Sequence, residues 1–361
     1  MQPNDSKPTL LLLSHCMPAA DGDAERARAW QLLRLASRTH RVYLRCLADG
    51  PINLEQWRSV LPWTTRASIV TGRRWRHHDT SLLQRFTLRF MQKWIKDRIL
   101  ADGVDQWHQS DRYEHVLCTN SLLLPAAMQV SASHRMCDLL AVGSSPLQQI
   151  ELAGAADTMF TFNNPADESL LDRASLQHAH VPLAADTTQL FREPCADHAS
   201  TERLILGMGG NWHDSRQTLG WFQKRVWPLV HRVVPRAMLD VLDLSQRGHV
   251  HGVGVHPLKD ATYGHWSVLR SLASGQPAVT STQTAAQLGA TADRHLLTAD
   301  HEEDWANQCI KALRSAQLRV DLAQQARAFV QDHHDLKHTA LPLAPAAQMR
   351  HTKDASFKHA A

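Results

Sequence analysis

Two glycine-containing turns in the second half of the sequence could bind a phosphate group. GMGGN (207–211) follows an apolar run and precedes a helical segment, so its backbone can approach a ligand closely. Gly264 stands in the same relation to HWSVLRSLAS (265–274), which Gly275 and Pro277 terminate. The free N–H groups and the positive dipole end of each helix would favour an anion. Plain tight turns are the alternative interpretation of both motifs.

A fixed positive charge follows the second turn. Arg270 lies on the helix after Gly264, and a guanidinium has only hydrogen-bond donors. Arg270 would therefore bind a phosphate oxygen, or it is a solvated helix residue without a ligand. His213 and Arg216 would help to bind the same anion, or they lie exposed at a helix start. The predicted phosphate contacts are Gly209, Gly210, Asn211, His213, Arg216, Gly264 and Arg270.

Short apolar runs alternate with helical segments along most of the chain. The strand candidates of the first half are 9–15, 41–47, 67–70, 115–119, 135–140, 158–162 and 180–183, with a helix from about Asp23 to Arg38. Those of the second half are 204–209, 237–243, 249–258, 277–282 and 295–298, with closing helices from Glu302 and over 318–333. Such alternation indicates an α/β fold with parallel sheets covered on both faces.

A polar stretch without helical or strand periodicity, 192–203, divides the two halves. We therefore expect a Rossmann-like N-terminal domain over 1–191, a linker over 192–203, a second Rossmann-like domain over 204–335 and a flexible tail over 336–361. A chain of 361 residues is long enough for two such domains. Their sheets would face a cleft, where open α/β sheets bind ligands.

Composition and charge exclude several classes of protein. The chain is 43% apolar and 20% charged, as in soluble globular proteins, and its net charge of +4 is too small to indicate a nucleic-acid binder. The apolar run 9–13 is too short for a signal peptide or a membrane span. Six cysteines without a C-x-x-C pair indicate buried free thiols in a reducing compartment. We expect a cytoplasmic protein.

Histidine is unusually frequent, with 23 residues, but no metal site is predicted. His249 and His251 would share one face of a strand, yet nothing beside them completes a set of three or four converging ligands. We interpret the histidines as surface or strand residues.

The segment RRWRHHDTSLLQRFTLRFMQKWIKDRIL (73–100) concentrates positive charge, with eight Lys or Arg against two Asp. Its apolar residues form one helical stripe, namely Leu83, Phe86, Phe90, Trp94 and Ile95. Such a helix would pack this stripe on the core, or it would settle on an anionic membrane surface, where each basic residue contributes ~1 kcal/mol. A nucleic-acid partner is not expected, because no recognition module accompanies the patch.

The order of these parts resembles the family-4 glycosyltransferases of the GT-B architecture, especially the bacterial sugar transferases of exopolysaccharide pathways. Pro18, Gly22 and Arg26 match the family's P, G and R before the first helix. VPLAADTTQLF (181–191) stands where the family has V-P-N-G-V-D-x-x-x-F. LRSLASGQPAVTST (269–282) is similar to the signature E-A-x-A-x-G-x-P-V-V-x-T.

The resemblance covers most of residues 9–335 and implies transfer of a sugar from a nucleotide-sugar donor with retention of anomeric configuration. The donor would bind the C-terminal domain without a metal or another cofactor. A saccharide or lipid-linked acceptor of surface polysaccharide assembly would bind near Gly22 and Arg26. A lipid-linked acceptor would give the segment 73–100 a reason to contact the inner membrane peripherally.

Several positions depart from the family pattern. Arg270 replaces a glutamate that would accept hydrogen bonds from ribose hydroxyls, and Thr262 replaces a second carboxylate. The lysine frequent in the subgroup is Ser267, although the aspartate of V-P-N-G-V-D remains as Asp186. Residues 244–249 are too few for the strand and helix that the family usually has there. A second interpretation is therefore a glycosyltransferase-like partner or scaffold without catalysis.

Overall fold

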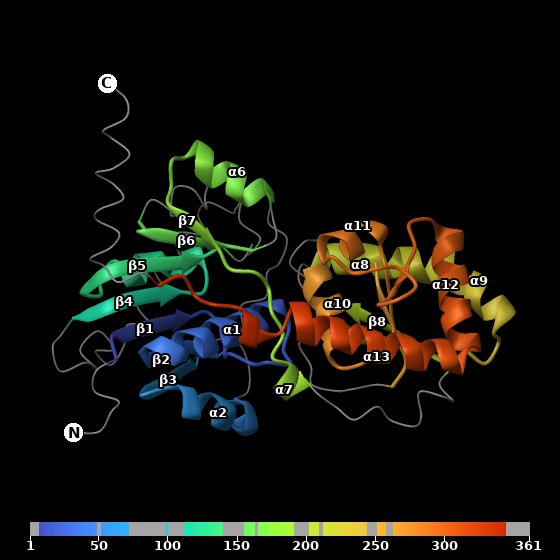
Figure 1. Cartoon of the computed structure of the whole chain (residues 1–361), viewed down its shortest axis with the longest axis horizontal. Helices are drawn as coiled ribbons and strands as arrows, with labels where there is room; N and C mark the ends of the chain where they lie inside the picture. Colours follow the sequence, from blue (N-terminus) through green and yellow to red (C-terminus); the bar gives the residue numbers. More distant parts are fainter. Residues whose placement is uncertain are drawn as a thin grey trace.

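The computed structural model describes residues 7–48, 52–71, 99, 112–139, 155–162, 165–190, 202–208, 212–243, 251–257 and 263–343. These residues form two domains, each built on a parallel β-sheet, that lie side by side (Figure 1). The expected α/β architecture with two parallel-sheet domains is therefore confirmed.

The N-terminal sheet has seven parallel strands in the order β3-β2-β1-β4-β5-β6-β7. The strands are β1 (Thr9–Ser14), β2 (Arg41–Ala48), β3 (Arg66–Thr71), β4 (Tyr113–Cys118), β5 (Ala132–Asp138), β6 (Thr158–Thr161) and β7 (His178–His180). β1 lies near the middle, and all six of its residues are buried. Leu10 and Leu12 pack into one core cluster, whereas Leu11 and Leu13 pack into another. The uninterrupted apolar run thus reflects a strand with both faces covered.

The helix α1 (Ala24–Thr39) covers one face of this sheet, where Trp30 and Leu33 join the cluster around Leu10. It begins after Asp23, whose Oδ1 accepts a hydrogen bond from the Arg26 backbone N–H at 3.0 Å. The other helices described in this domain are α2 (Leu54–Val60), α4 (Leu124–Ala127), α6 (Pro165–Arg173), α7 (Thr187–Leu190) and the 3-10 turns η1 (Leu61–Trp63) and η3 (Ser121–Leu123).

The C-terminal sheet has five parallel strands in the order β12-β11-β10-β8-β9. The strands are β8 (Arg203–Met208), β9 (Met238–Asp243), β10 (Val253–His256), β11 (Ala278–Thr280) and β12 (Leu297–Thr298). β10 is shorter than the expected strand 249–258. His251 is exposed before it, His249 lies outside the described residues, and Pro257, which has no N–H to donate, follows it.

Helices cover both faces of the C-terminal sheet. On one face, α8 (Trp212–Trp221) continues through a π-helical turn, η5 (Phe222–Val226), into α9 (Trp227–Val233), and α12 (Glu302–Arg314) packs beside them. On the other face lie α10 (Tyr263–Ala273) and α13 (Ala316–His333). The short α11 (Thr282–Gln287) follows β11.

Two segments that connect the domains run side by side at their junction. The Ala185 N–H donates to the His334 carbonyl at 2.8 Å, and the Leu336 N–H donates to the Ala185 carbonyl at 2.9 Å. The Thr187 hydroxyl donates to the Asp335 carboxylate. α13 leads the chain back toward the N-terminal domain at this point (Figure 1).

The chain after α13 packs on the N-terminal domain. Leu336, in the 3-10 turn η6 (Leu336–His338), is buried in the cluster around Leu10, and Leu341 and Leu343 pack against that cluster. Arg38 of α1 donates to the Leu336 and Thr339 carbonyls at 2.9 and 2.8 Å. Residues 336–343 of the expected tail therefore extend the N-terminal core. The expected linker falls mostly on residues 191–201, outside the described residues, and Arg203 already belongs to β8.

A buried ion pair links α1 to the end of β5. Both side chains are fully buried, and Asp138 accepts from Arg28 Nη2 at 2.7 Å and from Nε at 3.0 Å. Arg28 and Gln31 also donate to the Pro182 carbonyl, at 3.3 and 2.7 Å. The expected strand 180–183 therefore ends at His180, because the chain turns toward α1 there.

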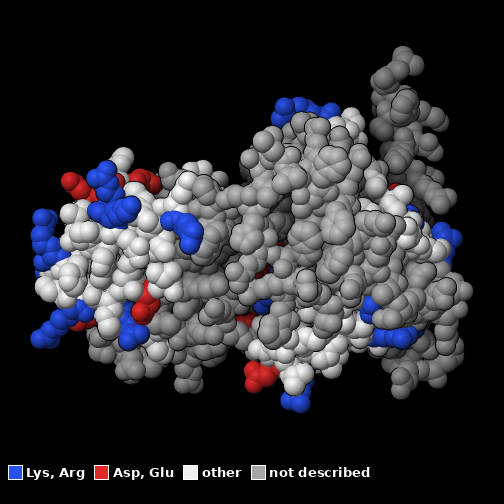
Figure 2. All heavy atoms as spheres, turned by 180° about the vertical axis from the view of Figure 1, so that it is seen from behind, with Lys and Arg blue, Asp and Glu red and all other residues white. Residues whose placement is uncertain are grey.

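The five cysteines in the described part of the chain are buried and unpaired, as expected. None of the described helices has the length and apolar character needed to cross a membrane. Of the basic segment 73–100, only Ile99 lies within the described residues. On the face shown in Figure 2, described Lys and Arg side chains of the C-terminal domain lie beside Asp and Glu, so charges of both signs are mixed there.

Two buried histidines contact each other at the amino-terminal edge of the N-terminal sheet. His40 Nε2 and His115 Nδ1 are 3.2 Å apart, and the residues are 5% and 4% exposed. Burial, and then neighbouring positive groups, lower the pKa of each from 6.5 to about 4. These neighbours are Lys7 and the second imidazole for His40, and His134 for His115.

This histidine pair should make the free energy of unfolding depend on pH. Between pH 6.5 and about 4 the unfolded chain binds protons that the folded chain does not. The contribution of the neutral histidine pair to the free energy of unfolding is therefore fully present above pH 6.5, and it is lost as the pH falls through about 4. Urea unfolding should show a steeper loss for the wild type than for the double variant His40→Gln/His115→Gln. If the free energy of unfolding falls equally steeply with pH in both proteins, the histidine pair is not the source of the pH dependence.

Candidate functional site

Each sheet has one point where successive connections leave in opposite directions. In the N-terminal sheet this point lies between β1 and β4, and in the C-terminal sheet it lies between β8 and β10. Ligands of open α/β sheets bind beyond the carboxyl ends of the strands at such points. The candidate site must therefore be sought at residues that follow these four strands.

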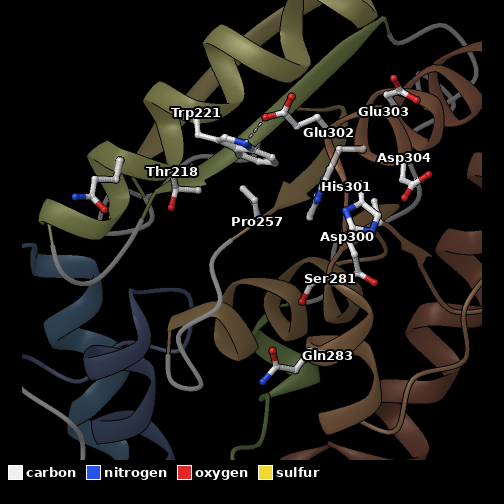
Figure 3. Close-up of a pocket in the computed structure, with 13 residues that line it drawn as sticks. Thr218, Trp221, Pro257, Ser281, Gln283, Asp300, His301, Glu302, Glu303 and Asp304 are labelled. Atoms are coloured by element: carbon white, nitrogen blue, oxygen red, sulfur yellow. Dashed lines mark hydrogen bonds between the residues drawn. The ribbon is translucent and has the colours of Figure 1, made fainter.

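A cavity of about 1290 Å³ opens at the carboxyl edge of the C-terminal sheet (Figure 3). Its described lining comes from α8, from the ends of β10, β11 and β12, from α11 and from the start of α12. The lining residues are Gln217, Thr218, Trp221, Pro257, Ser281, Gln283, Ala299, Asp300, His301, Glu302, Glu303, Asp304 and Trp305. The cavity thus lies where the order of this sheet predicts a ligand.

One wall of the cavity is acidic. Glu302, Glu303 and Asp304 form the first turn of α12, where carboxylates complement the positive end of the helix. Glu302 Oε1 accepts from Trp221 Nε1 at 3.2 Å, which ties this wall to α8 (Figure 3). Asp300 Oδ1 accepts from the Thr282 N–H at 3.1 Å. An anionic group of a ligand would be repelled from this wall, whereas a group with N–H or O–H donors would be accepted.

A buried polar network lies between β10 and α10. The Gln276 side-chain amide donates to the Gly252 carbonyl, so its Oε1 must be the atom that accepts from Ser271 Oγ at 2.7 Å. Ser271 therefore accepts from His256 Nε2 at 2.9 Å, and His256 Nδ1 carries the lone pair. A Cβ at Gly254 would lie 2.6 Å from His256 Nε2, so the imidazole needs a glycine beneath it.

Arg270 is buried beside this network. It is 5% exposed, and burial first and then the Arg270 charge lower the pKa of His256 to about 3. The interpretation of Arg270 as a solvated helix residue is therefore wrong, because the residue is buried beside His256. His256 is held neutral, which avoids two adjacent buried positive charges.

The predicted phosphate contacts are only partly described. Gly209, Gly210 and Asn211 lie outside the described residues, and so does the side chain of His213. Arg216 is exposed on α8, next to the lining residue Gln217. Gly264 is buried in the first turn of α10, and its carbonyl accepts from Ser267 Oγ at 2.9 Å. Arg216, Gly264 and Arg270 are not among the described lining residues.

The predicted acceptor-side residues lie at the contact between the domains. The Gly22 carbonyl accepts a hydrogen bond from Trp266 Nε1 of α10 at 3.0 Å, and Trp266 is buried. Arg26 Nε lies 3.9 Å from Asp23 Oδ2. Ala24 and Ala27 of α1 share an apolar cluster with Leu269 and Leu272 of α10. Gly22 thus connects the loop after β1 to the helix of the other domain.

A histidine that the sequence interpretation missed follows β1 directly. His15 Nε2 lies 2.9 Å from Glu25 Oε2, and His15 Nδ1 lies 2.7 Å from Thr119 Oγ1. Burial lowers the pKa of His15, but Cys16 and Glu25 outweigh it and raise this pKa well above 6.5. Polar residues at the ends of the predicted strands 9–15 and 115–119 were the signal that could have identified this contact.

No group of three or more His, Cys, Asp or Glu that could bind a metal ion occurs within the described part of the chain.

Solved structures with both domains resemble this chain over nearly its whole length. Sucrose-phosphate synthase from Thermosynechococcus elongatus is 16% identical, with a TM-score of 0.59 over 98% of this chain and 100% of that chain. Anabaena Alr3699/HepE, in complex with UDP and glucose, is 13% identical, with a TM-score of 0.55 over 96% and 100%. The chain has the GT-B fold.

An alpha-glucosyltransferase in complex with UDP shares the GT-B fold as well, at 11% identity and a TM-score of 0.56 over 92% of this chain and 97% of that chain. No protein-family model and no curated protein sequence matches the chain.

Replacing Gly22 should be far more damaging than replacing another glycine of the same protein. A Cβ at Gly22 would lie 2.6 Å from Arg26 Cβ, so Gly22→Ala must displace the loop, at a cost of ~1–3 kcal/mol. Gly220 of α8 has no atom within 4 Å of its Cβ position, so Gly220→Ala should stabilise the helix by about 0.5–1 kcal/mol. Urea unfolding of both variants measures the change in the free energy of unfolding, which should be a decrease for Gly22→Ala and an increase for Gly220→Ala. A neutral Gly22→Ala would contradict the geometry.

Proposed function

We propose that this chain is a glycosyltransferase that takes its sugar from a nucleotide-sugar donor. The observation that carries the proposal is the cavity at the switch point of the C-terminal sheet in a chain with the GT-B fold. A volume of about 1290 Å³ is ample for a nucleotide-sugar. Two proteins of similar fold, HepE and the alpha-glucosyltransferase, contain UDP in their structures, which supports the same ligand class here.

The charges of the cavity indicate how the nucleotide would be oriented. The carboxylates at the start of α12 disfavour the diphosphate, so the base and ribose would occupy that side of the cavity. The diphosphate would then point toward the starts of α8 and α10, where helix N-termini favour an anion. Arg270 would contribute a positive charge from α10. This arrangement requires no metal ion or cofactor.

The finer parts of the proposal rest on the sequence resemblance. They are transfer with retention of anomeric configuration, and a saccharide or lipid-linked acceptor in surface polysaccharide assembly. The resemblance to family 4 and to the exopolysaccharide enzymes supports these parts. A contact of the segment 73–100 with an anionic membrane surface belongs to the same proposal.

One observation favours a second candidate, a partner or scaffold protein without catalysis. Arg270 stands where the resembled family has a glutamate, and it is buried beside a neutral His256. Neither group is a carboxylate that could accept hydrogen bonds from both hydroxyls of a ribose. A protein that had lost donor binding would retain this packing and the fold.

A thermal-shift panel of UDP, GDP, ADP and CMP tests the proposed function. At a hundred times its Kd, a ligand should stabilise the folded protein by ~2.7 kcal/mol. The variant Gln283→Trp should reduce the shift, because Gln283 lines the cavity and a larger side chain fills it. Gln324→Trp, at an exposed position of α13, is the matched control. If the protein is folded and no nucleotide of the panel raises its melting temperature, the result would favour the second candidate, a partner or scaffold protein without catalysis.

The substitution Arg270→Met separates a phosphate-binding arginine from one that only packs. Methionine keeps the length and the burial of the side chain but removes its charge and donors. If Arg270 binds the diphosphate, nucleotide affinity should fall at least about tenfold, as for loss of a charged hydrogen bond. Arg319→Met is the control, because Arg319 is a buried arginine that donates to carbonyls of α12. An unchanged Kd in Arg270→Met would exclude the phosphate role.

A further inference from the structure

A histidine at the carboxyl end of β10 has one ring nitrogen that no other group in the fold uses. His256 is the last residue of β10 and is 3% exposed. Its Nδ1 is buried and has no hydrogen-bond partner among the residues that the structure describes. Burying a polar atom without a partner is unfavourable, so a ligand that would satisfy Nδ1 must be sought.

The hydrogen bonds behind the imidazole make Nδ1 an acceptor. Ser271 donates its hydroxyl proton to Gln276 Oε1 at 2.7 Å, so the contact of 2.9 Å between Ser271 Oγ and His256 Nε2 has its proton on Nε2. The neutral ring then has its lone pair on Nδ1. Burial, and then the charge of Arg270, lower the pKa of His256 to about 3, so the ring stays neutral above that pH.

The same contacts determine where Nδ1 points. A Cβ at Gly254 would lie 2.6 Å from His256 Nε2, and Ser271 belongs to the last turn of α10, so Nε2 is turned back toward the amino end of β10. The two nitrogens of an imidazole point away from each other, which turns Nδ1 toward the carboxyl edge of the sheet. The next residue, Pro257, lines the cavity at this edge (Figure 3).

The carboxyl end of β10 lies between the two parts of the proposed nucleotide. On one side is α10, whose start is the proposed position of the diphosphate. On the other side is the cavity, whose acidic wall favours the base over the diphosphate. The ribose joins these two parts in every nucleotide. Its hydroxyls can donate a hydrogen bond to a lone pair, whereas the oxygens of an ionised diphosphate have no proton to donate.

We propose that His256 Nδ1 accepts a hydrogen bond from one ribose hydroxyl of the bound nucleotide. The inference rests on the proposed function and adds a specificity-determining residue on β10. One lone pair accepts from one hydroxyl, whereas a carboxylate could accept from both. The affinity of this chain for a nucleotide should therefore depend on only one of the two ribose hydroxyls. Ser271 and Gln276 are positioning residues, because they hold the ring proton on Nε2.

The test measures, by calorimetry on the intact protein, the affinities for UDP, 2′-deoxy-UDP and 3′-deoxy-UDP, and for the corresponding GDP and ADP series. One deoxy analogue should bind the wild type about tenfold more weakly than the ribonucleotide, as for loss of a hydrogen bond to a buried acceptor. The other analogue should bind with the affinity of the ribonucleotide. The position of the sensitive hydroxyl identifies the one that His256 accepts from.

Two variants of His256 separate the acceptor from the packing of the ring. His256→Gln can place a polar atom near Nε2 but none at Nδ1, so the ribonucleotide should bind about tenfold more weakly and no better than the sensitive analogue. His256→Asn places its amide oxygen near Nδ1 and should retain most of the discrimination. His115→Gln, at another buried histidine with an unpartnered nitrogen, is the matched control and should change no affinity.

Three results would overturn the inference while the proposed function stands. They are equal affinities of the wild type for a ribonucleotide and both of its analogues, equal losses for the two analogues, and a discrimination that persists in His256→Gln. If the folded wild type binds no nucleotide of any series, the proposed function fails, and the inference fails with it.

Discussion

The relative placement of the two domains depends on the hydrogen-bonded crossing of their two connections. Ala185 pairs with the backbone on both sides of Asp335, and Thr187 donates to the Asp335 carboxylate. Asp186, between them, accepts from Trp30 Nε1 at 3.0 Å and from Arg34 Nη1 at 2.5 Å, both on α1. One short segment thus holds the first helix, the last helix and the junction together.

Two positive side chains of the N-terminal domain are paired with carboxylates, whereas two basic groups of the C-terminal domain are kept from both being charged. Arg28 is paired with Asp138, and protonated His15 with Glu25, while His256 is kept neutral beside Arg270. Removing one member of such a pair leaves an uncompensated charge, which costs far more than the pair contributes. These pairs therefore fix the rotamers of the paired side chains.

The sequence predicts the strands and helices well wherever the apolar pattern is continuous. β1, α1 and β2 fall almost on their expected residues, because the Leu-rich runs mark the buried segments and the Asp23 cap marks the start of α1. The bounds of 180–183 and 249–258 were wrong for different reasons. The first strand ends where the Pro182 carbonyl accepts from Arg28 and Gln31, and a local pattern carries no information about such distant partners. The second ends before Pro257, which has no N–H to donate and which the sequence did show.

The site was less predictable than the fold. Gly22 was recognised from the resemblance, but its contact with Trp266 joins residues that are far apart in the chain. Arg270 was recognised as a departure from the family pattern, yet its burial beside His256 depends on how α10 packs against β10, which the sequence does not show. His15 and Thr119 were missed because no spacing rule relates two loops that only the parallel pairing of β1 and β4 brings together.

The glycine beneath the His256 ring has a consequence for sequence variation. Any side chain at Gly254 would strike the imidazole, and the imidazole in turn depends on Ser271 and Gln276 for its one bonded nitrogen. These four positions are therefore expected to covary among homologous chains. A chain with alanine at position 254 should have a smaller residue than histidine at position 256.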